Sequence, residues 1–199
     1  MRRGGSARPA AASRASGGPS WPLQLTRNLL LWLPPVALVW LLVTPYYNLF
    51  LTHAAENLVR LTERPDVTRL QTHDRHHLVI TRTGARVPGL PYSVRTTDVH
   101  FHLVLLGALF LAVPSVPWRQ RLANLGWALL ATVFFHLLDL LFWVKFVYAT
   151  QLGAWSAARY GAFGQNFWGL GKHLLDLPVK LALPLALWGV AYLGELRRR

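Results

Sequence analysis

Ionisable side chains lie inside long apolar stretches of this sequence, where they could transfer protons, bind a metal or form ion pairs. The motif His-Leu-Leu-Asp-Leu occurs at 136–140 and again at 173–177, and Lys180 follows the second copy. His and Asp three residues apart share a helix face, so each pair can point at one partner. The repetition alone is also compatible with chance in a Leu-rich chain. Charged groups inside a membrane are costly, however, and usually mark a functional site or a buried pair.

The depths of these charges along the apolar stretches match in pairs. Counting ~1.5 Å per helical residue from the inner end of each stretch places Asp139 at roughly 25 Å and Lys180 at roughly 24 Å. Because buried ions in a bilayer are expected to pair, we predict an intramembrane pair between these two residues. The same count places Lys145 at roughly 34 Å and Asp176 at roughly 30 Å, which predicts a second pair. Lys172, Asp176 and Lys180 are spaced by four, so they should line one helix face.

Further histidines stand at the mouth of another apolar stretch. His100 and His102 follow Asp98 closely, and with His136 and Asp139 they are the candidate catalytic or metal-ligating residues. Residues two apart on a helix face different ways, so His100 and His102 could act together only if the helix is extended or frayed there. Two interpretations remain open. These groups either form a site that opens to the outer side or hold the helices in register, and we favour a chain without a bound metal or cofactor.

Four apolar stretches must position these residues. They run over about 29–51, 99–116, 122–148 and 177–196. Crossing a hydrocarbon core of ~30 Å takes roughly 20 helical residues, which is close to the length of each stretch. Because backbone polar groups in lipid must be paired internally, the stretches are helices. The predicted fold is an all-α integral membrane protein with four transmembrane helices, and its membrane domain covers residues 26–199.

Composition and charge agree with a membrane protein. Hydrophobic residues make up 53% of the 199 residues, the formal net charge is +13, and there is no cysteine, which excludes disulfides and thiolate chemistry. The arginines fall mainly outside the apolar stretches and form no basic groove with interleaved aromatics, so we expect no nucleic-acid partner. Residues 1–25 are rich in Gly, Ala, Ser, Pro and Arg, which predicts a disordered basic tail.

The positions of the basic residues predict the orientation in the membrane. Clusters of Arg lie in the tail, at Arg119 and Arg121, and at residues 197–199. Basic residues next to span ends favour the cytoplasmic side. We therefore predict a multi-pass protein of the bacterial inner membrane with both termini in the cytoplasm.

The predicted external region is the loop 52–98. Its first part, up to Pro65, has good helix formers and should extend the first span. Residues 67–72 and 77–83 alternate like strands and predict a short β-hairpin. The segment 84–91 contains Gly and Pro and predicts an irregular return to the membrane, and the Gly-rich segment 150–171 predicts a second external loop.

The order of these features resembles a known family. An opening span with Leu29-Leu-Leu-Trp-Leu-Pro-Pro precedes the external hairpin, Leu90-Pro91-Tyr92-Ser93 re-enters the membrane, and the basic turn Pro117-Trp118-Arg119-Gln120-Arg121 leads into a long span. This layout is similar to the small membrane proteins that accompany exosortases in bacteria, especially the exosortase H-associated membrane protein family. The likeness covers most of residues 25–196 and lies in arrangement. Exosortases themselves open one span with a catalytic Cys, and this chain has Arg95-Thr-Thr-Asp98 near that place instead.

The sequence thus predicts a non-catalytic accessory membrane protein. The resemblance implies that it assists an exosortase-type protein sorting system, with the lipid bilayer and an exosortase-like membrane protein as partners. GxSxG, HExxH, P-loop and GxGxxG motifs are absent, which removes the signatures of common hydrolases, zincins and nucleotide-binding proteins. The alternative is an integral membrane enzyme with a His/Asp site at the outer leaflet. A transporter ranks third, because four spans would need oligomerisation to enclose a path.

Overall fold

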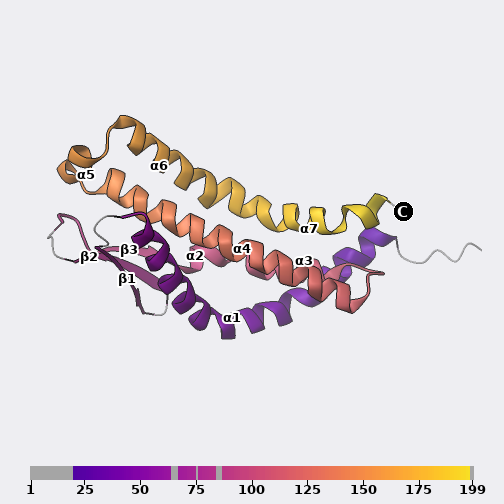
Figure 1. Ribbon diagram of the computed structural model, residues 1–199. Helices are drawn as coiled ribbons and strands as arrows, with labels where there is room; N and C mark the ends of the chain where they lie inside the picture. Colours follow the sequence, from indigo (N-terminus) through magenta and orange to yellow (C-terminus); the bar gives the residue numbers. More distant parts are fainter. Residues whose placement is uncertain (1–19, 64–66, 75, 84–86, 198–199) are drawn as a thin grey trace, which may run out of the picture.

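Long helices make up most of the chain (Figure 1). The computed structural model describes residues 20–63, 67–74, 76–83 and 87–197. In order, its elements are α1 (Trp21–Leu61), β1 (Thr68–His73), β2 (His77–Arg82), β3 (Tyr92–Arg95), α2 (Thr97–His100), α3 (Leu103–Ala112), α4 (Trp118–Phe146), the π-helical turn η1 (Val147–Gln151), α5 (Ala154–Arg159), α6 (Ala162–Leu174), the π-helical turn η2 (Leu175–Val179) and α7 (Lys180–Arg197). The sequence predicts a tail over residues 1–25, of which residues 1–19 lie outside the described ranges. Residues 21–25 of the predicted tail are helical, because α1 begins at Trp21.

Within the described ranges, three helices are long and apolar enough to cross a membrane. They cover Trp21–Leu61, Trp118–Gln151 and Ala162–Gly194. The predicted second span, 99–116, is shorter than expected, since the apolar helix covers Thr97–Ala112. It ends there because Val113 precedes Pro114 and takes an extended backbone, with ψ of 115°. The chain is therefore a mostly helical membrane protein with a small sheet.

Helix α1 is bent along its length (Figure 1). Pro34, Pro35 and Pro45 lie inside it. Each proline lacks an N–H and its ring crowds the preceding turn, which is the usual cause of a kink. The end of α1 runs on to Leu61, so the predicted helical extension of the first span is confirmed. Its beginning packs beside α3, where the Asn28 side chain donates a hydrogen bond to the carbonyl of Ala112 at 3.1 Å.

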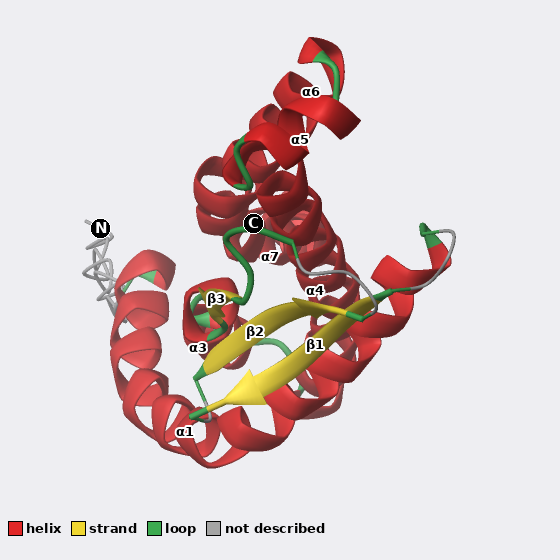
Figure 2. Ribbon diagram, turned by 90° about the vertical axis from the view of Figure 1, so that its left-hand side faces the viewer, coloured by secondary structure: helices red, strands yellow, loops and turns green. Residues whose placement is uncertain are grey.

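The predicted β-hairpin is present. β1 and β2 pair antiparallel from Thr68 opposite Arg82 to His73 opposite His77. A third strand, β3, pairs with β2, where the sequence predicts only an irregular return. The strands lie inside the arc of α1 (Figure 2). Buried Leu70, Leu78, Ile80 and Val94 join the core that α1 and α4 provide, and this apolar face fixes the register.

The segment 150–171, which the sequence predicts as a loop, is mostly helical. That segment contains α5 and all but the last turn of α6, because its aromatic and Ala residues support helix where the Gly residues suggest a break. Helices α6 and α7 follow each other through η2, which contains Pro178, and run back along α4 (Figure 1). The sheet and α5 lie at one end of the bundle, here named the sheet end. The start of α1 and the C-terminus lie at the other (Figure 1).

Candidate functional site

The ionisable residues singled out in the sequence meet in the interior of the helix bundle. His100 is 2% exposed, His102 3%, His136 and Asp139 0%, and Lys180 1%. They come from α2, the turn before α3, the middle of α4 and the first residue of α7. Side chains that are far apart in sequence therefore form one buried polar cluster.

Three side chains from three parts of the chain form a hydrogen-bonded series. The Tyr47 hydroxyl lies 2.7 Å from His136 Nδ1, and His136 Nε2 lies 3.3 Å from His102 Nε2. One proton must lie between the two facing Nε2 atoms, so the tautomer of one imidazole dictates that of the other. The series links α1, α4 and the turn before α3, and it could pass a proton only among these three groups.

His100 is fixed separately from that series. Its Nε2 lies 2.7 Å from the Asn48 amide oxygen, to which it can only donate. The rings of Trp40 and Tyr47 contact it edge-on, with centroids 5.2 Å and 5.5 Å away. Phe101 and His102 form a turn between α2 and α3, and both keep near-helical backbone angles. The His100 and His102 rings both approach His136, at centroid distances of 6.5 Å and 5.0 Å.

Lys180 is the centre of the charged part of the cluster. Its Nζ lies 3.3 Å from Asp139 Oδ2, and it donates to Asp176 Oδ1 at 2.6 Å and to the backbone carbonyl of Asp98 at 3.0 Å. Lys172 pairs with the second oxygen of Asp176 at 2.9 Å, as expected for groups four apart on one helix face. Among the described residues, neither buried oxygen of Asp139 accepts a hydrogen bond, and Lys180 is the cation within ion-pair distance of it.

The pairing predicted for Lys145 with Asp176 does not form. Lys145 pairs instead with Glu63, whose Oε1 lies 3.7 Å from its Nζ, while Asp176 is shared by Lys172 and Lys180. The depth count ignores direction around the helix. Lys145 faces the end of α1, and Asp176 finds both partners on its own helical stretch at positions i−4 and i+4.

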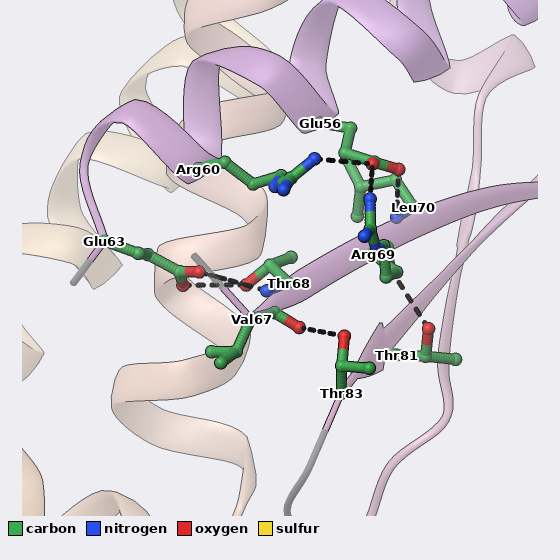
Figure 3. Close-up of polar contacts among 9 residues, drawn as sticks. All are labelled: Glu56, Arg60, Glu63, Val67, Thr68, Arg69, Leu70, Thr81 and Thr83. Atoms are coloured by element: carbon green, nitrogen blue, oxygen red, sulfur yellow. Dashed lines mark hydrogen bonds and ion pairs between the residues drawn. The ribbon is translucent and has the colours of Figure 1, made fainter. Parts of the chain in front are cut away.

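Glu63 also anchors the sheet to α1. Its carboxylate accepts hydrogen bonds from the Thr68 backbone N–H at 3.1 Å and from the Thr68 hydroxyl at 2.7 Å (Figure 3). Two turns earlier, Glu56 accepts from the Leu70 backbone N–H at 3.0 Å and pairs with Arg69 at 3.0 Å (Figure 3). The start of β1 is thus tied to α1 by two carboxylates, which no motif in the sequence marks.

A polar cavity of about 390 Å³ opens beside this anchor at the sheet end. It is lined by Thr62, Glu63, Arg82, Lys145, Tyr148, Trp155, Arg159 and Tyr160. Sequence reasoning did not single out Arg82 or Arg159. The wall combines residues just after α1 with residues of β2, α4, η1 and α5, so no local spacing could indicate the cavity.

An apolar groove of about 370 Å³ lies on another face, between α1, α3 and α4. Its lining includes Trp32, Val36, Trp40, Gly107 and Leu129. It contains no ionisable side chain, and the Trp40 ring separates it from His100. The apolar lining of this groove suits hydrocarbon.

In the described ranges, no group of three or more His, Asp or Glu side chains is arranged to hold a metal ion. His102 and His136 face each other through Nε2, but His100 turns its Nε2 to Asn48. Comparisons with protein-family models, curated proteins and solved structures found no match for this chain.

Proposed function

We propose that this chain is a non-catalytic accessory protein of the bacterial inner membrane that assists an exosortase-type protein sorting system. The observation that carries the non-catalytic part is burial. The candidate catalytic side chains His100, His102, His136 and Asp139 are at most 3% exposed. A catalytic group must touch its substrate, so side chains packed within the bundle are better suited to hold helices together.

The proposal includes four membrane crossings. Thr68 at the start of the sheet bonds to the hydroxyl of Tyr148, in the turn that follows α4, at 2.9 Å. Arg121 near the start of α4 donates to the carbonyl of Leu111 at 2.8 Å. Together with the contact between His102 and His136 at 3.3 Å, this bond sets the segment from His102 to Leu111 beside the part of α4 from His136 back to Arg121. If that part of α4 crosses the bilayer, the neighbouring segment crosses it too. Basic residues gather at the far end, which supports the proposal that both termini lie in the cytoplasm.

The exosortase-type partner is supported by the order of spans, hairpin and basic turn in the sequence. The surface of α1 provides room for such a partner. Large apolar side chains there are 62–69% exposed, namely Leu30, Leu31, Leu38, Leu41 and Leu42. Such a face lies against lipid tails or against another apolar helix, and the helix can come from a partner protein.

Site-specific photo-crosslinking in the host membrane tests the proposal. A crosslinker placed at Leu42 on α1 should capture an exosortase-type transpeptidase, identified by mass spectrometry, and a crosslinker at Leu181 on α7 probes a second exposed apolar face. Enrichment of the transpeptidase from either face supports the proposal, and the pair of positions shows which face binds. Crosslinks to lipid alone from both faces would contradict it.

A specific observation also favours the enzyme alternative. His100 Nδ1, His102 Nδ1 and both oxygens of Asp139 are buried without a hydrogen-bond partner in the described structure. Such groups are rare in proteins and can be satisfied by a bound ion or water. If the alternative holds, the purified protein contains a stoichiometric metal that is lost in His102→Ala. Protein that folds and carries no such metal contradicts the metal form of the alternative.

A further inference from the structure

We infer that the polar cavity at the sheet end binds a phosphate group at the membrane surface. The cavity holds three cations, Arg82, Lys145 and Arg159, against one carboxylate, Glu63. Its volume of about 390 Å³ far exceeds the ~30 Å³ that one water occupies in the liquid. The cavity therefore has room for an anionic group and an excess of positive charge to attract it.

The two arginines are held by rings and not by acids. Arg82 lies over Tyr148 and Trp155, with its Cζ 5.8 Å and 5.4 Å from the ring centroids. Arg159 lies 5.1 Å from the Trp155 centroid. In the part of the chain that the structure describes, neither guanidinium has a carboxylate within ion-pair distance. A guanidinium over a ring keeps its N–H groups in its own plane, and those that the protein does not use can form the paired hydrogen bonds that a phosphate accepts.

The single acid in the wall is already occupied. Glu63 accepts both the N–H and the hydroxyl of Thr68 and lies 3.7 Å from Lys145. The Glu63 carboxylate therefore interacts with Thr68 of β1 and Lys145 of α4. The positive charges of Arg82 and Arg159 are not neutralised by it, so their side of the cavity remains positive. Burial raises the pKa of Tyr160 above its ordinary value, and the nearby Glu63 charge adds to this effect. The Tyr160 hydroxyl therefore stays protonated and can donate to an anion.

The position of the cavity explains which phosphates can reach it. Its lining residues lie where α4 continues through η1 into α5, at the end of a candidate membrane span. Figure 1 shows that the sheet and α5 share this end of the bundle. Trp155, Tyr148 and Tyr160 are side chains typical of the interface between lipid and water. A lipid headgroup phosphate and a free phosphate ion can both enter there, and they share the chemistry that the arginines recognise.

Thermal unfolding of the full-length protein in a neutral detergent tests this inference, because a ligand that binds the native state raises the midpoint. The probes are short-chain phosphatidylglycerol, short-chain phosphatidylcholine, and inorganic phosphate at constant ionic strength. The variants are Arg82→Gln and Arg159→Gln. Arg95→Gln is the control, since Arg95 is an exposed residue of the same sheet and the change in net charge is equal. Because Arg159 is exposed, its variant tests the cavity without disturbing the core.

We expect phosphatidylglycerol to raise the midpoint more than phosphatidylcholine, with an affinity about tenfold lower in each cavity variant and unchanged in Arg95→Gln. Arg82→Lys keeps the charge and should retain part of the binding. A response to inorganic phosphate with the same dependence on Arg82 would show that a soluble phosphate is the ligand. The inference is overturned if none of the probes raises the midpoint, or if Arg95→Gln weakens binding as much as Arg82→Gln does.

Discussion

Removing Lys180 should destabilise the protein more than removing its partner Asp139. Lys180 has three acceptors, namely Asp139 at 3.3 Å, Asp176 at 2.6 Å and the Asp98 carbonyl at 3.0 Å. In Lys180→Met, Asp139 is left as a fully buried carboxylate without a counter-ion. In Asp139→Asn, Lys180 keeps its other two acceptors. The structure thus predicts unequal losses from the two halves of one ion pair.

The size of the larger loss follows from general values for broken buried pairs. Such a break costs about 3–5 kcal/mol, and each kcal/mol lowers the melting temperature of a protein of this size by roughly 2–4 °C. Lys180→Met should therefore lower the melting temperature in detergent by roughly 6–20 °C. Asp139→Asn should cost clearly less, and the double variant should recover part of the Lys180→Met loss because no lone carboxylate remains.

Lys172→Met is the matched control. Lys172 is also buried and also pairs with Asp176, but its removal leaves Asp176 paired with Lys180. The melting temperature is measured for all four variants under one condition. Equal losses for Lys180→Met and Lys172→Met, or additive losses in the Asp139/Lys180 double variant, would refute the reasoning.

Three further predictions concern topology, packing and the sheet anchor. Reporters fused after Arg199 should read cytoplasmic and those within 66–90 external, and a cytoplasmic reading from 66–90 would overturn the orientation. Gly171→Ala should lower the free energy of unfolding by about 1–3 kcal/mol, because its new Cβ would collide with a ring of α4. Gly189→Ala places its Cβ in open space, so its free energy of unfolding should change much less in the same thermal unfolding assay. Glu63→Gln should lower the free energy of unfolding by about 1–3 kcal/mol, because the start of β1 loses hydrogen bonds to a charged acceptor. An unchanged unfolding midpoint would show that these hydrogen bonds do not stabilise the fold.

The proximity of Asp139 to Lys180 could be anticipated because both lie on regular helices. Rise per residue is constant in a helix, so depth along two antiparallel spans can be counted from sequence. Lys145 shows the limit of that count. Its depth resembled that of Asp176, but its direction around α4 points to the end of α1, where Glu63 lies. Direction depends on how helices rotate and bend against one another, which the prolines of α1 and the turn at η2 alter.

The hairpin and the helical extension of α1 were predictable from local pattern, whereas β3 was not. The strand Tyr92–Arg95 is short and follows Gly and Pro, and it becomes a strand because β2 presents an open edge to it. The cavity at the sheet end could not be foreseen for the same reason. Arg82, Lys145 and Arg159 are separated by long segments and meet only after the sheet has docked on the helices.

The most direct test of the proposed function is the amount of correctly sorted surface protein in the host, divided by the amount of this chain that is folded in the membrane. His136 is a candidate catalytic residue that is 0% exposed and bonds to Tyr47 and His102. The measurement compares wild type with His136→Gln and His136→Ala in the host, and divides the amount of correctly sorted surface protein by the amount of folded chain in the membrane. We predict an unchanged ratio, with any loss of sorting matched by loss of folded protein. Abolished sorting at wild-type levels of folded protein would contradict the account and favour the enzyme.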